Sequence, residues 1–444
     1  MAAAMAAAPD HSLPDQHEDW SDLKATYRFF QNPKVTPEGI QQMHRLKVRA
    51  VCASHAKILA VQDGSELDYT AHRAVEGLGF VGGGLGRGLL QHSTLAVTTE
   101  GGLLGVLHQI WWKRERTAEG ETRRQRQARE TESDLWAKSI RAVGSLGPAT
   151  RVIHVTDRGG DCFETMQAAY ELGSGFLIRA KHDRYLGDGD ERLWALLQRQ
   201  AVAGLREVEV PARPKKGKSP AQPARRASLT VRFSPVVVPP PRNDPRFSKP
   251  LSVGAVYVCE INPPAEVEPI EWMLLTSEPV EHVDQANACV DWYTYRWLIE
   301  EWHKVEKTGC RLEASQLKSA EALERLAALT AVVAVRLLQL RDLAQAAMSW
   351  TAPEPESPSA QAAELQAVVP RDWILVVSHL ARCRPEALTP HRFWLTLAKR
   401  GGFIGRRSDG VPGWQTIWKG WSEIMMIVQG FELHRAIHPE KSCG

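Results

Sequence analysis

A helix-spaced run of polar side chains carries the strongest chemical signal in this sequence. At about 100° per residue, five positions share one face of a predicted helix and hold a phenol, a guanidinium, a carboxylate and two ammoniums. These residues are Tyr293, Arg296, Glu300, Lys304 and Lys307. The carboxylate can ligate a hard cation, and the cationic groups can bind phosphate oxygens. A solvated helix held by pairs four residues apart, such as Glu300 with Lys304, is the alternative for the same pattern.

Two aspartates each close a short apolar run typical of a β-strand. Residues 57–63 end in Asp63 and residues 151–157 end in Asp157, and a glycine follows each acid within two residues. Strands that end in this way leave the carboxylate uncrowded at the edge of a sheet. Taken by itself, an aspartate that follows a strand and precedes a glycine is commonly an ordinary turn residue. Two such strands and the helix stripe together indicate an acidic triad of Asp63, Asp157 and Glu300.

The motifs also resemble those of a known family. The string YTYRWLIEEWHKVEKTG at 293–309 resembles the Tyr-x2-Arg-x3-Glu-x6-Lys signature of the insertion-sequence-four family of bacterial cut-and-paste transposases. The strings VQDGSELDYT and VTDRGGD, around Asp63 and Asp157, are similar to the family's first and second acidic motifs. This resemblance implies that Asp63, Asp157 and Glu300 are the catalytic and metal-binding acids.

The same resemblance implies a set of DNA contacts. The expected phosphate-binding side chains are those of Tyr293, Arg296, Lys304 and Lys307. Arg179 and Lys181 resemble further contacts of the family. Trp272 stands in a Trp-x-Leu-Leu-Thr context in which the family's tryptophan stacks on a base flipped out of the duplex. On composition alone, a tryptophan that heads an apolar strand is more often a core residue.

The order of predicted elements around the two aspartates is that of a ribonuclease-H-like core within an α/β protein. After the first strand come a glycine-rich span at 77–88, strands at 93–99 and 103–112, and a helix at 133–145. Glu100-Gly101-Gly102 predicts a hairpin turn between the two strands. The strand that ends in Asp157 then lies beside the first strand. The glycine-rich span lacks the Lys-Ser/Thr ending of a nucleotide-binding loop, so we expect a flexible or DNA-adjacent loop.

A basic, proline-rich stretch separates Asp157 from Glu300. Residues 211–250 contain ten Lys or Arg and a single acid, Asp244. Taken by itself, such a stretch is more often a solvated linker than a binding surface. The family inserts a β-rich subdomain at this place and uses it against DNA, and strand-like runs at 227–238, 253–261 and 271–276 fit that insertion. Phosphate neutralisation by the cations would provide affinity that does not depend on base sequence.

The C-terminal part is predicted to be helical. Residues 319–343 indicate a core helix packed under the sheet, and 351–360 have the composition of a linker. Trp414, Trp418 and Trp421 then form one aromatic helix stripe, a pattern usual in cores. The resemblance implies that helices in this region pair two copies of the chain across two transposon ends, as a homodimer in a synaptic complex.

Composition limits the classes of protein that fit. The 444 residues are 43% hydrophobic with a net charge of +3, which permits a large core and several structural units. No apolar run reaches the roughly 20 residues of a membrane helix, and the alanine-rich start lacks the features of a secretory signal. Seven scattered cysteines without a CxxC pair indicate neither a zinc site nor a disulfide framework. We therefore expect a cytoplasmic protein without a membrane partner, and the resemblance implies that it is bacterial and nucleoid-associated.

Clustered carboxylates imply a cation. Three close acids repel one another unless divalent ions neutralise them, and oxygen-only ligation suits Mg²⁺, with Mn²⁺ as a substitute. Two ions about 4 Å apart can support an in-line displacement at phosphorus. By resemblance, the steps on double-stranded DNA are nicking, hairpin formation, hairpin resolution and strand transfer from the transposon ends to target DNA.

The resulting prediction is a DDE transposase with six regions. They are a low-complexity leader (1–24), a remnant of an N-terminal DNA-binding region (25–50), the first part of the core (51–200), a β-rich insertion (201–284), the catalytic-helix part of the core (285–345) and a helical dimerisation region (346–444). Family members have a helical end-binding region before a motif that corresponds to 25–33, and here the acidic, alanine-rich leader stands in its place. Two alternatives stay open: an N-terminally shortened inhibitory form that binds DNA or dimerises, and a related DNA nuclease.

Overall fold

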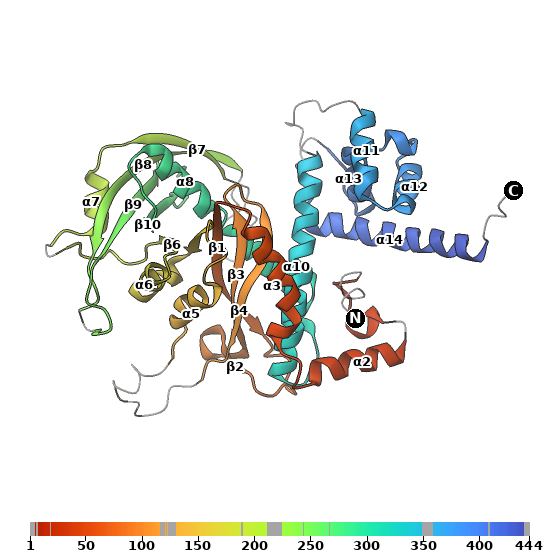
Figure 1. Cartoon of the computed structure of the whole chain (residues 1–444), viewed down its shortest axis with the longest axis horizontal. Helices are drawn as coiled ribbons and strands as arrows, with labels where there is room; N and C mark the ends of the chain where they lie inside the picture. The colour runs from red at the N-terminus through yellow and green to blue at the C-terminus, as the bar shows by residue number, and fades with distance from the viewer. Residues whose placement is uncertain are drawn as a thin grey trace. The chain divides into compact units, whose positions relative to one another are not determined.

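The chain divides into two compact units, an α/β unit and a helical unit. A computed structural model describes residues 5, 8–17, 19–115, 120, 122, 130–187, 190–210, 224–242, 244–265, 267–348, 358–406 and 409–438. The α/β unit comprises residues 36–303 and 316–324, and the helical unit comprises 1–35, 304–315 and 325–444. Figure 1 labels the elements of both units.

The α/β unit is built on one mixed sheet. Its strands are β1 (Lys57–Asp68), β2 (Gly79–Val81), β3 (Gly86–Thr98), β4 (Leu103–Trp112), β5 (Arg151–Thr156), β6 (Gly175–Arg179), β7 (Gly204–Val210), β8 (Arg225–Val238), β9 (Leu251–Glu260) and β10 (Glu271–Thr276). Over the described residues the strand order is β2-β3-β1-β5-β6-β10-β9-β8-β7, with β4 paired to β3. Only the β1–β5 and β5–β6 pairs are parallel among these pairings.

Helices flank this sheet. They are α3 (Pro37–Cys52), α5 (Asp134–Val143), α6 (Phe163–Glu171), α7 (Leu193–Arg199), α8 (Val283–Thr294) and α9 (Trp297–Lys304), the last residue of which belongs to the helical unit. Helix α3 packs on β4, α5 packs on α6 and β4, and α8 packs on β8. The α/β class with a mixed sheet flanked by helices is thus confirmed (Figure 1).

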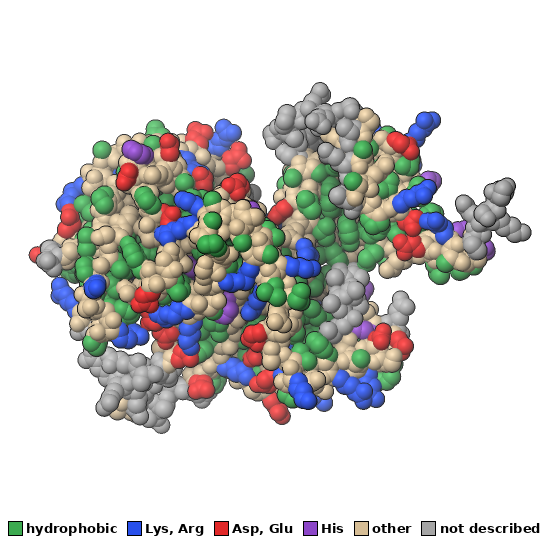
Figure 2. Space-filling model, in the orientation of Figure 1, with side chains coloured by type: hydrophobic (Ala, Val, Ile, Leu, Met, Phe, Trp, Pro, Cys, Tyr) green, Lys and Arg blue, Asp and Glu red, His purple; other side chains and the backbone are tan. Residues whose placement is uncertain are grey.

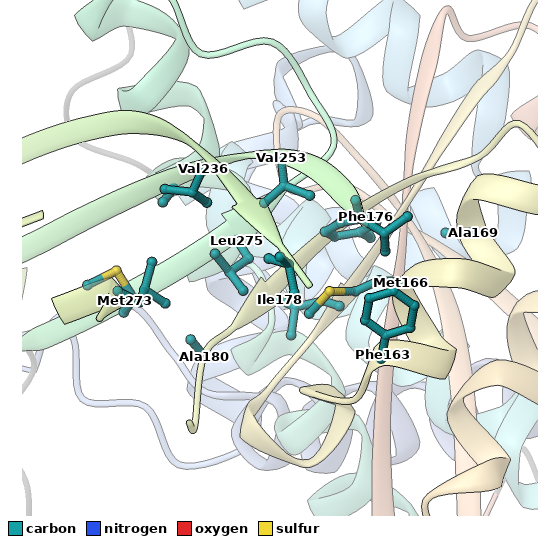
Figure 3. Packing of buried hydrophobic residues seen from close by; sticks show 14 of the residues in the cluster. Phe163, Met166, Ala169, Phe176, Ile178, Ala180, Val236, Val253, Met273 and Leu275 are labelled. Atoms are coloured by element: carbon teal, nitrogen blue, oxygen red, sulfur yellow. The ribbon is translucent and has the colours of Figure 1, made fainter. Parts of the chain in front are cut away.

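Apolar strand residues explain why these elements stay together. Ile58, Leu59, Ala60 and Val61 of β1 are all fully buried, as expected for a strand covered on both faces. A second core lies between α6 and strands β6, β8, β9 and β10, where Phe163, Met166, Phe176 and other apolar side chains interdigitate (Figure 3). This core holds α6 against the strands β6, β8, β9 and β10 that continue the sheet beyond β5.

Most predicted elements before Asp157 are present, but two differ. The hairpin turn at Glu100–Gly102 and the helix near 133–145 are confirmed. Strand β1 continues beyond Asp63 to Asp68, because β3 pairs with it as far as Asp68↔Gly88. The glycine-rich span is not simply a loop, since it contains β2 and the start of β3. A side chain at Gly88 would place its Cβ 1.9 Å from the Leu67 carbonyl oxygen, so glycine permits this pairing.

The strands of the expected insertion continue the main sheet. Strand β10 pairs antiparallel with β6, and β9, β8 and β7 follow outward. The predicted runs at 227–238, 253–261 and 271–276 correspond to β8, β9 and β10. Four of the ten basic residues of the 211–250 stretch (Arg213, Lys215, Lys216 and Lys218) lie outside the described residues.

The helical unit has its own core. Its helices are α2 (Trp20–Gln31), α11 (Pro358–Val368), α12 (Arg371–Leu380), α13 (Pro390–Arg400), α14 (Trp414–Ile437) and most of α10 (Ala320–Met348). Trp414 and Trp418 are buried, and Trp421 packs against Trp373 and Trp394, with ring centroids 4.5 and 6.2 Å away. The aromatic stripe therefore belongs to the core. The predicted linker at 351–360 lies largely outside the described residues, and α11 begins at Pro358.

In the part of the chain that the structure describes, no helix is long and apolar enough to cross a membrane.

Candidate active site

Asp63 lies where β1 loses one of its two neighbours. The parallel pairing of β1 with β5 ends at Val61↔Val155, whereas antiparallel pairing with β3 continues through Asp63↔Ser93. The Asp63 carboxylate is therefore next to the open end of β5. Its Oδ1 accepts a hydrogen bond from the Gly64 amide at 2.8 Å, and the side chain is 18% exposed.

Asp157 follows the last residue of β5, as predicted. Its Oδ1 accepts a hydrogen bond from the Gly159 amide at 2.7 Å and caps the short 3₁₀ turn Arg158–Gly160. A cap of this kind fixes the carboxylate at the strand end. Because β1 and β5 are adjacent and parallel, Asp63 and Asp157 emerge at the same edge of the sheet.

Glu300 enters this site from α9, and Arg296 enters it from the turn just before that helix. Arg296 Nη1 lies 3.5 Å from Asp63 Oδ2, and Arg296 Nη2 donates to Glu300 Oε1. The Arg296 side chain is 18% exposed, whereas the Glu300 side chain is 55% exposed. One guanidinium thus bridges the acid of β1 and the acid of α9.

The surroundings of Asp63 raise the pKa of its carboxyl group, mainly through burial. Burial raises the pKa of Asp63 to about 7; the charge of Arg296 opposes this shift, and the charges of Asp157 and Glu300 add to it. Burial lowers the pKa of Arg296, but the Glu300 charge and hydrogen bond and the Asp63 charge outweigh burial and raise it. The three acids of the predicted triad therefore interact electrostatically.

The donor chemistry of this site fits a hard divalent cation. All three side chains are carboxylates, the ligands preferred by Mg²⁺ and Mn²⁺. Within the described residues, however, no group of three or more His, Cys, Asp or Glu side chains is assembled around one metal position. Two of the three acids engage the Arg296 guanidinium instead.

The predicted stripe is not one uninterrupted α-helix. Tyr295 and Arg296 form a turn between α8 and α9, and residues 305–309 form a π-helical turn after α9. Such turns change the angular spacing of the side chains that follow. Lys304 ends α9, and Lys307 lies in the π-helical turn with its Nζ 3.6 Å from Glu313 Oε1.

The hairpin turn between β3 and β4 supports the segment that carries Arg296. Gly101 has φ of +90°, and a Cβ at this position would lie 2.7 Å from Cε1 of the Tyr295 ring. The backbone of the turn therefore approaches the aromatic ring directly. This contact positions the residue immediately before Arg296.

Trp272 and Tyr293 form a partly covered aromatic pair. Their ring centroids are 5.3 Å apart with the planes at 66°. Tyr293 is only 5% exposed, so its ring is a packing residue as well as a predicted phosphate contact. Trp272 is half-buried on β10, which leaves part of the indole accessible.

Arg179 and Lys181 lie around the end of β6. Arg179 Nη2 donates to the Glu271 carbonyl oxygen at 3.0 Å, which links β6 to the residue before Trp272. The Lys181 side chain is exposed, and its amide donates to Asp161 Oδ2 at 2.6 Å. Both cations lie in the α/β unit with the three acids.

Asp161 has a structural role that the sequence prediction missed. Its carboxylate is fully buried, accepts hydrogen bonds from the amides of Lys181 and His182, and lies 2.7 Å from Arg184 Nη2. It therefore holds the loop after β6. In the sequence, Asp161 is visible as the second acid of the VTDRGGD string. That string does not show that its partners are the residues 181–184.

A buried polar chain lies under Asp63 and was also missed. Gln62 Nε2 is 3.0 Å from His154 Nδ1, and Gln62 Oε1 is 3.2 Å from His92 Nε2. Burial lowers the pKa of both histidines to about 3, so both rings are neutral near pH 7. The chain ties β1 to β3 and β5. Its signal in the sequence is a polar residue inside each apolar strand.

Three of the six described basic residues of the 211–250 stretch, Arg225, Arg226 and Arg246, are ion-paired. Arg225 bonds Glu260, and Arg246 pairs with Asp244 at 2.7 Å. Figure 2 shows Lys and Arg side chains interspersed with Asp and Glu over the viewed face of the α/β unit. A uniform basic surface does not stand out on this face.

Two family models match the chain, one near each end. The model described as "Transposase DNA-binding" matches residues 1–35, which include both the acidic leader and the 25–33 motif. The model described as "Transposase Tn5 dimerisation domain" matches residues 384–440, which include α13 and α14. These matches support a transposase, with DNA and a second copy of the chain as its partners. They bear out the resemblance in the sequence and support a Tn5-like transposase.

Proposed function

We propose that this chain is a DDE transposase with a ribonuclease-H-like core that moves DNA by a cut-and-paste reaction. The observation that carries the proposal is the convergence of Asp63, Asp157 and Glu300, from two adjacent parallel strands and one helix. The raised pKa of Asp63, to which both other acids contribute, supports this convergence. The family matches at the two ends support the DNA and dimer partners.

The three carboxylates would hold Mg²⁺, with Mn²⁺ as a substitute and two ions as the expected number. When bound, these ions would activate an attacking oxygen and stabilise the leaving oxygen at phosphorus. The chain's own contribution is to position the acids: the Gly159 amide donates to Asp157 Oδ1, and the Gly64 amide donates to Asp63 Oδ1. The proposed reaction order is nick, hairpin, hairpin resolution and strand transfer.

The DNA-binding side of the proposal uses the cations and Trp272. Arg296, Lys304 and Lys307 would hold the strand by its phosphates, with Tyr293 supporting them. Arg179 and Lys181 add cations after β6. Trp272 would offer a stacking surface for a flipped base because its indole is only half-buried.

The test is Mg²⁺-dependent cleavage of DNA that carries the terminal sequences of the element, once these are located as inverted repeats beside the coding region. Asp63→Asn and Glu300→Gln should each reduce nicking by at least about 10²-fold, since loss of a ligand removes transition-state stabilisation. Glu301→Gln is the matched control, one residue along the same helix, and should retain activity. DNA binding without cleavage by the unaltered protein would favour the inhibitory alternative. Cleavage without joining would favour the nuclease alternative.

A further inference from the structure

The Arg296 side chain would have to move before Asp63 and Glu300 could bind a metal ion. Its guanidinium contacts oxygens of both Asp63 and Glu300, the acids contributed by β1 and α9. Lone pairs engaged by a guanidinium are less available as metal ligands. No three-acid cluster is assembled around a single metal position in the described residues, although the three charges influence one another.

Both contacts of Arg296 are suited to exchange. The contact with Asp63 Oδ2 is long at 3.5 Å, and the partner at Glu300 is more than half exposed, so solvent screens that ion pair. Arg296 also lies in the two-residue turn between α8 and α9 rather than inside a helix. A change of side-chain direction therefore requires no helix to unwind.

A DNA phosphate is a strong competitor for this side chain. Guanidinium groups form paired, charge-assisted hydrogen bonds with phosphate oxygens, with a geometry at least as favourable as that with one carboxylate oxygen. Each carboxylate released by such an exchange loses its counter-cation. The remaining cluster of acids then favours a divalent cation more strongly than before.

We propose that Arg296 is a latch that couples DNA binding to metal binding: it holds Asp63 and Glu300 in the free protein and releases them when it moves to a DNA phosphate. This inference rests on the proposed function and adds a regulatory step to it. The coupling is reciprocal, so a divalent cation strengthens DNA binding by the same factor as DNA strengthens cation binding. The acids thereby become available to the cation only when a DNA strand is in place.

The test measures Mn²⁺ binding to the full chain by electron paramagnetic resonance, which reads the free ion and requires no cleavage. In the absence of DNA, Arg296→Gln should bind Mn²⁺ at least about 5-fold more tightly than the unaltered protein. Arg199→Gln is the matched control, because it removes an exposed cation of the same unit that pairs with Glu191 rather than with the three acids, and it should leave the affinity unchanged. Circular dichroism checks that each variant is folded.

A second titration adds a short duplex, with the duplex alone as background. The unaltered protein should gain Mn²⁺ affinity, whereas Arg296→Gln should gain little because its carboxylates are already released. Equal or weaker Mn²⁺ affinity of DNA-free Arg296→Gln would overturn the latch. Failure of the proposed function would instead appear as absent cleavage by the unaltered protein, so the two failures are distinguishable.

Discussion

Asp161→Ala tests whether the buried acid after Asp157 is structural rather than catalytic. The substitution removes the ion pair with Arg184 and the acceptor for the amides of Lys181 and His182. Arg184 is only 17% exposed, and its Nη1 is buried without a hydrogen-bond partner. An uncompensated buried cation would therefore remain.

The expected cost follows from these contacts. Breaking one side of a buried ion pair costs about 3–5 kcal/mol, much of it from the charge left behind. Asp161→Ala should therefore lower the free energy of unfolding of the α/β unit by about that amount. The double variant Asp161→Ala with Arg184→Met should recover part of the loss, because no unpaired cation remains.

Urea denaturation followed by tryptophan fluorescence and circular dichroism measures this effect. Asp161→Asn is the closer control, since its amide oxygen can still accept the two backbone hydrogen bonds, and it should cost less than Asp161→Ala. An unchanged denaturation midpoint for Asp161→Ala would refute the structural role. So would a double variant that is less stable than the single one.

Three further predictions concern other parts of the molecule. Because burial raises the folded pKa of Asp63 to about 7, protonation of this carboxylate favours the folded state. In metal-free buffer, the free energy of unfolding should rise as the pH falls through about 7 and should level off below about 4. The gain should be at most about 4 kcal/mol, and Asp63→Asn should abolish it. Trp272→Ala should nick DNA almost normally but accumulate nicked product before the hairpin step. DNA that lacks the base at the flipped position should partly restore hairpin formation by this variant. Equal relative rates of nicking and hairpin formation would make Trp272 a core residue. On α14, Met426 and Leu433 are 63% and 60% exposed within the matched dimerisation region. Leu433→Glu should therefore shift the chain toward monomer, as measured by light scattering. Gln429→Glu, at a nearby exposed position, is the control and should not.

Local patterns were sufficient to predict much of the fold around the site. Asp157 lies directly after β5, and the hairpin turn at Glu100–Gly102 is present, because apolar strand runs and glycine turns are encoded within a few residues. The helix over 134–143 follows from its amphipathic spacing in the same way. These signals do not depend on distant parts of the chain.

The features that were missed depend on contacts between distant segments. Strand β1 continues past Asp63 because β3 pairs with it, and the glycine at position 88 permits that approach. Gln62 is buried only because His92 and His154 meet it from neighbouring strands. The bond of Arg296 to Asp63 joins residues 233 positions apart, which no helical stripe could indicate.

The most direct test of the central claim compares Asp157→Asn with Asp161→Asn in Mg²⁺-dependent cleavage of the same DNA. The two acids lie four residues apart, but only Asp157 sits at the end of β5 beside Asp63, whereas Asp161 is buried under the loop after β6. We predict that Asp157→Asn loses cleavage while remaining folded, and that Asp161→Asn retains cleavage when its folded fraction is taken into account. An active Asp157→Asn protein together with a folded but inactive Asp161→Asn protein would contradict the assignment of the triad.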